Sequence, residues 1–297
     1  MNAVRIIALP VIAASLLASE PALADSEFTG SVSTRGVAAK RDILQNDEFD
    51  SSGFGADVSL RGEKDFSILR FWAKGSAGIF QYLDQERENR QVLQGEIGIA
   101  RDFGEDFEIS LRGVYSQNLV FVEALSADQQ RARAQVKWEA DGNRFQAYGE
   151  YRKRQYDQLV PADGTGTRFG GHYNRRLGSY HWVRVGGFAD TIDSTDDERD
   201  YNRISGSVEY SHPVSRMFRG RASVDVRTWK FPGRIARGDA TGATRQDNAI
   251  TPQVGVDYGR ATGLFGRARA GYEMRKSNDE RFDGNTPRLS LEVGYRF

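Results

Sequence analysis

The last residues of the chain, PRLSLEVGYRF at positions 287–297, decide the fold. Apolar or aromatic side chains stand at every second position from Leu289 to Phe297, with Ser, Glu, Gly and Arg between them. Successive side chains of a β-strand point to opposite faces, so this alternation predicts a strand with one apolar and one polar face.

The same alternation recurs at 107–118, 129–140, 217–230 and 264–276. These segments are longer than ordinary strands and match the roughly 9–11 residues with which a tilted strand crosses a bilayer. Their apolar face is rich in Gly and Ala with aromatic residues near the ends, and their polar face carries charges of both signs. The pattern predicts an all-β fold, a transmembrane antiparallel up-and-down β-barrel, and disfavours a soluble sandwich.

We expect about fourteen strands, with twelve or sixteen as open alternatives. The predicted strands are 27–39, 52–62, 66–81, 91–102, 107–118, 129–140, 144–156, 168–177, 180–191, 201–211, 217–230, 248–259, 264–276 and 287–297. Short connections, the first at Gly62–Asp65, alternate with long ones, the longest at Phe231–Asp247. Short periplasmic turns and longer extracellular loops are typical of such barrels, so both termini are expected in the periplasm.

The N-terminus predicts export. Arg5, an apolar stretch over 6–18 and the small-residue pattern Ala22-Leu23-Ala24 indicate a signal peptide at 1–24, followed by one barrel domain at 25–297. The apolar stretch is shorter than the roughly 20 residues of a membrane anchor. The chain has no Cys, which excludes disulfides, a Cys zinc site and a Cys nucleophile. Its 41 basic and 41 acidic residues balance, which argues against a nucleic-acid partner.

Two resemblances refine this prediction. Val293, Tyr295 and the terminal Phe297 resemble the β-signal of Gram-negative outer-membrane proteins. That likeness implies the cell outer membrane, with its lipid and lipopolysaccharide, and the barrel assembly machinery as partners. The segments 199–210 and 272–278 resemble the β-barrel porin family encoded in exopolysaccharide gene clusters, a likeness that covers only the C-terminal third of the chain.

Charged residues on the predicted inward faces are the candidate functional groups. The candidate lumen-lining residues are Arg112, Arg131, Arg133, Arg152, Arg154, Arg219, Arg221, Arg267, Arg269, Glu139, Glu150, Asp225 and Glu273. Rings of arginine and carboxylate can select solutes, and a guanidinium binds carboxylates or phosphates. In the alternative interpretation these residues pair across strands, at about 0.2–1 kcal/mol each, and fill the bore. The long 231–247 connection is either a plug inside the bore or a solvated loop.

Enzymatic chemistry has little support in the sequence. The only histidines are His172, His181 and His212, the last expected in a short turn before Pro213, and none lies in a recognisable nucleophile–base pattern. No metal site and no cofactor are predicted, since the acidic loops do not fit a defined calcium loop.

The leading hypothesis is a porin-like channel for small hydrophilic or anionic solutes, or one that assists exopolysaccharide export. The alternatives are a closed structural or surface-binding barrel and, least favoured, an outer-membrane enzyme. A channel predicts ion conductance that changes when Arg219 and Arg221 become Glu.

Overall fold

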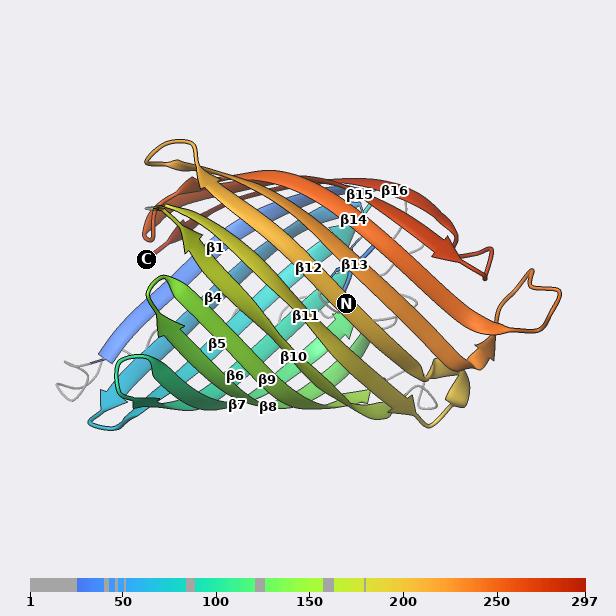
Figure 1. Ribbon diagram of the computed structural model, residues 1–297, viewed down its shortest axis with the longest axis horizontal. Coiled ribbons are helices and arrows are strands. Elements are labelled where there is room, and N and C mark those ends of the chain that lie inside the picture. The colour runs from blue at the N-terminus through green and yellow to red at the C-terminus, as the bar shows by residue number, and fades with distance from the viewer. Residues whose placement is uncertain are drawn as a thin grey trace, which may run out of the picture.

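A computed structural model describes residues 26–39, 43–45, 48–50, 52–83, 89–120, 126–156, 163–178 and 180–297. Fourteen strands pair with their neighbours to form one closed antiparallel barrel (Figure 1). The barrel strands are β1 (Ser26–Ala39), β4 (Gly53–Phe66), β5 (Leu69–Tyr82), β6 (Arg90–Phe103), β7 (Phe107–Val120), β8 (Ser126–Ala140), β9 (Asn143–Gln155), β10 (Gly164–Leu177), β11 (His181–Ser194), β12 (Tyr201–Pro213), β13 (Phe218–Ile235), β14 (Thr244–Gly259), β15 (Gly263–Ser277) and β16 (Gly284–Arg296). The predicted all-β barrel of fourteen strands is confirmed.

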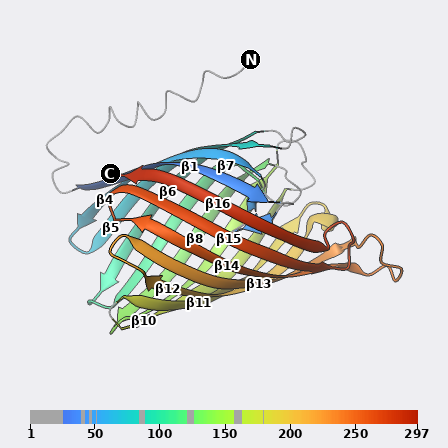
Figure 2. The same cartoon turned by 90° about the horizontal axis from the view of Figure 1, so that it is seen from above.

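The first and last strands close the barrel (Figure 2). Strand β1 pairs with β16 on one side and with β4 on the other. Beyond the last residue of β16, Phe297 donates its N–H to the Gly30 carbonyl at 3.0 Å and accepts the Gly30 N–H at 2.7 Å. Closure leaves no edge among the fourteen barrel strands unpaired, as a lipid environment requires.

The two ends of the barrel differ. At one end the strands are joined by short turns, such as Ser67–Ile68 between β4 and β5 and Asp141–Gly142 between β8 and β9. We call this the short-turn end, and β1 begins and β16 ends there. The opposite, long-loop end carries the longer connections and the β13–β14 hairpin, which projects past the other strands (Figure 1).

Two small elements lie at the long-loop end. The connection after β1 contains a hairpin of β2 (Ile43–Gln45) and β3 (Glu48–Asp50), which form a separate two-stranded sheet. The 3-10 helix η4 (Asp197–Arg199) contacts β11 and β13.

The apolar residues of the strands face outward. Ile97, Phe169 and Leu264 leave 69%, 66% and 64% of their surfaces exposed, while the polar residues that alternate with them point into the barrel. An outward apolar face is stable only against lipid, because water would penalise so large an exposed apolar surface. Among the described residues there is no helix long and apolar enough to span a membrane.

Three local predictions are wrong. Gly62–Asp65 is part of β4. The turn begins at Ser67, which has a positive φ of 44°, and no glycine or proline at this position indicates a turn in the sequence. Most of Phe231–Asp247 is strand, because β13 and β14 continue outward as a hairpin joined by residues 236–243. This segment therefore projects away from the barrel and does not plug it. His212 lies in β12 and pairs across to β13, so it is not in a turn.

Candidate functional site

All thirteen predicted lumen residues lie on the inward face, opposite the exposed apolar side chains. They are Arg112 on β7, Arg131, Arg133 and Glu139 on β8, Glu150, Arg152 and Arg154 on β9, Arg219, Arg221 and Asp225 on β13, and Arg267, Arg269 and Glu273 on β15. Their part in transport stays a prediction. Seven of them belong to two regions, a buried ion network and an arginine-lined cavity, and the other six lie outside both.

The buried network centres on Asp190 of β11, which is 3% exposed. Its Oδ2 accepts a hydrogen bond from Nη2 of Arg152 at 2.7 Å, of Arg168 at 2.8 Å and of Arg203 at 2.8 Å. Arg203 also donates Nε to Oδ1 at 3.0 Å. One carboxylate thus holds guanidiniums from β9, β10 and β12 together, away from water.

The network continues onto β8 and is covered by rings. Glu150 accepts a hydrogen bond of 2.8 Å from Nε of Arg133, and Nη2 of the same arginine forms an ion pair with it at 2.6 Å. The Arg168 and Arg203 guanidiniums lie 4.3 and 4.9 Å from the centre of the Phe188 ring. Toward the long-loop end follows a buried apolar cluster of Ile192, Tyr201, Trp229 and Phe231. The interior beside β9–β13 is therefore packed with side chains in this half of the barrel.

The arginine cavity lies at the short-turn end, inside β1 and β13–β16. Its volume is about 770 Å³. Two carboxylates, Asp257 and Glu292, line it together with nine arginines: Arg35, Arg216, Arg219, Arg221, Arg260, Arg267, Arg269, Arg288 and Arg296. Nine positive against two negative residues leave a formal excess of seven positive charges on its wall.

Only part of this positive charge is neutralised by ion pairs. Asp257 accepts hydrogen bonds at 2.5 Å from both Arg221 and Arg269. Glu292 pairs with Arg267 at 2.9 Å, and Arg221 also reaches a third carboxylate, Glu209. By contrast, the hydrogen bonds of Arg219 go to neutral oxygens, Oγ of Ser211 and the carbonyl of Tyr180. Guanidiniums that keep their charge beside open volume attract anions.

The remaining predicted residues form smaller groups. Arg112 lies 3.7 Å from Glu96, and Glu139 holds Arg144 through two hydrogen bonds. Glu273 is buried between Arg275 at 2.9 Å and Arg227 at 3.8 Å. Asp225 also points inward on β13, two residues before Arg227. Arg154 donates to Gln129 at 3.0 Å.

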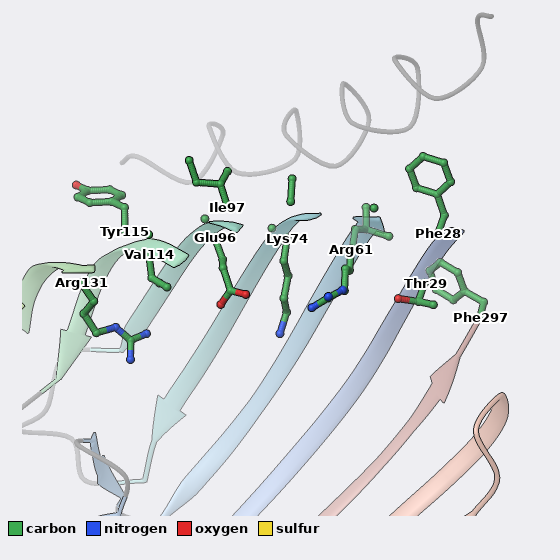
Figure 3. A pocket seen from close by; sticks show the side chains of 16 residues that line it. Phe28, Thr29, Arg61, Lys74, Glu96, Ile97, Val114, Tyr115, Arg131 and Phe297 are labelled. Carbon is green, nitrogen blue, oxygen red and sulfur yellow. The ribbon is translucent and has the colours of Figure 1, made fainter. Parts of the chain in front are cut away.

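A second cavity, of about 780 Å³, lies at β1 and β4–β8 and has a different character. Figure 3 shows Phe28, Ile97 and Tyr115 on one side of the sheet and Arg61, Lys74, Glu96 and Arg131 on the other. Small residues, among them Gly75, Gly95 and Gly113, make the outward face shallow here. Its surface is mostly apolar, so this hollow suits lipid and not a polar solute.

Sequence reasoning missed several residues of both regions. Asp190 and Arg168 lie in the stretch 168–191, where Gly170-Gly171 and Gly186-Gly187 obscure the alternation. Arg35, Arg288 and Arg296 lie on strands that were predicted correctly, and their inward positions could have been read from those strands.

Comparisons with known proteins agree with this geometry at the level of the fold. No family model matches the sequence, and no curated protein matches it. The outer-membrane channel DcaP of Acinetobacter baumannii is 10% identical with a TM-score of 0.57, over 94% of this chain and 99% of that one. An anion-selective porin from Comamonas acidovorans is 10% identical with a TM-score of 0.53, over 92% and 99%. A bacterial polysaccharide outer-membrane secretin is 12% identical with a TM-score of 0.52, over 92% and 98%.

The closed barrel and its outward apolar face define the class: the chain is a membrane-type β-barrel. Its fold is the one found in outer-membrane porins and channels.

Proposed function

We propose that this barrel is a diffusion channel that prefers small anionic solutes. The observation that carries the proposal is the cavity of about 770 Å³ with nine arginines and two carboxylates on its wall. A wall with this excess of fixed positive charge concentrates anions and repels cations in the water beside it. In this proposal the short-turn end and both termini face the periplasm, so that the arginine cavity lies at the periplasmic mouth.

The barrel size is compatible with passage. Barrels of eight strands are filled by their own side chains, whereas those of sixteen to eighteen leave an aqueous channel. Fourteen strands lie between these limits, and the packed interior beside β9–β13 narrows the bore further. The expected channel is therefore narrow, with its widest charged chamber at the short-turn end.

The test is single-channel recording of the refolded barrel, residues 25–297, in a planar bilayer with a KCl gradient. We expect steady conductance steps and a reversal potential that reports chloride preference. Arg219→Glu should lower the chloride-to-potassium ratio by about sixteenfold at low salt. It changes the wall by two charges, which about 10 Å away in water shift chloride and potassium by roughly 0.8 kcal/mol each, in opposite directions. Arg219 suits this test since it holds no carboxylate that would be left unpaired.

A matched control comes from the outer surface. Lys230→Glu makes the same change of charge at an exposed outward position of β13 and should leave selectivity unchanged. A barrel that shows heat-modifiable migration but no conductance would overturn the channel and support the closed structural barrel. A channel that prefers potassium would overturn the role of the arginines.

Assistance in exopolysaccharide export is the second form of this proposal, and the same arginines support it because an acidic polysaccharide carries the charge they attract. An acidic oligosaccharide added on the short-turn side should interrupt the current if the cavity holds a polymer. Acetate, added so that the concentration of carboxylate groups is the same, should not interrupt the current. Equal effects of the two anions would favour small solutes.

A further inference from the structure

Two of the three histidines meet on the outer surface near the short-turn end. His181 begins β11 and His212 lies near the end of β12, and these neighbouring strands run antiparallel (Figure 1). The register Trp182↔Ser211 places the two histidines opposite each other, one residue further on. Side chains directly opposite on paired strands have their Cβ atoms about 4.5–5.5 Å apart, so the imidazoles reach each other without strain.

Three donor atoms converge at this point. Nδ1 of His181 lies 2.9 Å from Nδ1 of His212 and 2.9 Å from the phenol oxygen of Tyr210. The same phenol oxygen lies 3.4 Å from Nδ1 of His212. Tyr210 and His212 share one face of β12 because they are two residues apart. The three atoms therefore form a small triangle on the outward side of two strands.

The chemistry of this triangle suits a metal ion. Only one hydrogen can lie between two Nδ1 atoms 2.9 Å apart, so at least one imidazole lone pair points at the other ring. Imidazole nitrogen is a preferred ligand of zinc and copper. Around a tetrahedral Zn²⁺ with bonds of about 2.0–2.1 Å, ligand atoms lie about 3.3 Å apart. Separations of 2.9, 2.9 and 3.4 Å need only a small outward adjustment.

We propose that His181, His212 and Tyr210 form a binding site for a first-row divalent cation of the zinc and copper class. The histidines supply two nitrogens, the tyrosine oxygen a third ligand, and water the open position. Among the described residues no three His, Cys, Asp or Glu side chains gather to hold a metal. The third protein ligand of this site is therefore the phenol oxygen of Tyr210. A bound cation joins β11 to β12 at the short-turn end, independently of any solute in the barrel.

The chain offers an exact control, because His172 is its only other histidine and lies on β10, away from this pair. Untagged full-length barrel in detergent is dialysed against Zn²⁺, and bound metal is measured per chain. We expect one Zn²⁺ in the wild type and in His172→Ala. His181→Ala and His212→Ala should each weaken binding at least tenfold, and Tyr210→Phe should weaken it less. Heat-modifiable migration confirms that each variant is folded.

A spectroscopic measurement separates coordination from a mere hydrogen-bonded triad. Cu²⁺ bound to the wild type should show electron-spin coupling to two imidazole nitrogens. Cu²⁺ bound to His181→Ala or to His212→Ala should show coupling to one. Zn²⁺ should also raise the thermal unfolding midpoint of the wild type but not of His181→Ala, since a ligand bound only by the folded state stabilises it. The proposal is overturned if the folded wild type binds no Zn²⁺, or if His181→Ala binds it as tightly.

Discussion

Arginine is the dominant inward residue of both the Asp190 network and the arginine cavity, yet it has a different environment in each. Around Asp190 the guanidiniums of Arg152 and Arg203 are 0% and 2% exposed and share one carboxylate. In the cavity, Arg221 and Arg269 share Asp257 in the same way, but all three side chains keep 21–27% of their surface accessible. The comparison teaches that water access, and not residue type, decides whether an inward arginine holds strands together or presents charge to a solute.

Removing the central carboxylate of the buried network should have the largest effect. Asp190→Ala leaves three guanidiniums without their shared anion, and breaking a buried pair from one side costs about 3–5 kcal/mol. We therefore expect the urea concentration at the midpoint of unfolding in detergent to fall correspondingly. Heat-modifiable migration on a gel measures the folded fraction at each urea concentration.

The matched change in the cavity is Asp257→Ala, which also takes a carboxylate from two arginines. Because those arginines can turn into water, we expect a loss of about 1 kcal/mol or less. Equal losses for the two variants would show that the Asp190 network is hydrated and would remove the distinction between the regions.

The sequence predicted the shell of this molecule better than its interior. Alternation is a local property, so residues such as Leu289–Phe297 display it without knowledge of the fold. The fourteen strands and their inward faces followed from it. The extension of β13 and β14 past the other strands could not be predicted in this way. Gly233 suggests a loop in the sequence, whereas in the structure it packs against Asp197 of η4.

The two candidate regions required information that one sequence does not contain. Arg152 and Asp190 are 38 residues apart and meet only because β9, β10 and β11 lie side by side. Local alternation shows that each charge points inward. It cannot show that one group of charges is sealed by Phe188 and Trp229 while another borders open volume.

A subtler change should sharpen the role of the cavity. Asp257→Asn removes one negative charge and keeps the shape, so the positive excess of the wall grows by one. A unit charge about 10 Å from a passing ion in water changes the free energy of that ion by roughly 0.4 kcal/mol. Chloride and potassium shift in opposite directions, so their permeability ratio changes by about fourfold.

We therefore expect the chloride-to-potassium ratio to rise about fourfold in the reversal-potential measurement at low salt. It should return toward the wild-type value in 1 M salt, where charges are screened beyond about 3 Å. Glu198→Gln is the control, because Glu198 is exposed on η4 at the long-loop end, away from the cavity. An unchanged ratio in Asp257→Asn would place the ion path away from these arginines.

A third arginine–aspartate pair, on the loop after β15, lies between the two extremes. Asp279 is fully buried, whereas Arg281 is one-third exposed, and they share two hydrogen bonds of 2.9 and 2.6 Å. These bonds hold the pKa of Asp279 at about 2, below its ordinary 3.8. A depressed carboxylate pKa stabilises the folded loop above the unfolded value, and this contribution disappears as the pH falls through about 2. Because Arg281 is partly exposed, we expect about 1 kcal/mol or less.

Pepsin cleavage beside Phe282 measures this effect, since the enzyme works across the relevant acidic range and the ring packs on Arg245 when the loop is closed. At pH 4 the wild type should be cut up to about fivefold more slowly than Asp279→Asn, the factor that 1 kcal/mol provides. Below pH 2 the two rates should converge, because the wild-type carboxyl is then protonated as well. A ratio that stays constant from pH 4 to pH 2 would mean that the ion pair does not hold this loop. If the two cleavage rates converge, the ion pair of Asp279 follows the same rule as those of Asp190 and Asp257. In all three, the exposure of the guanidinium to water determines how much the pair stabilises the fold.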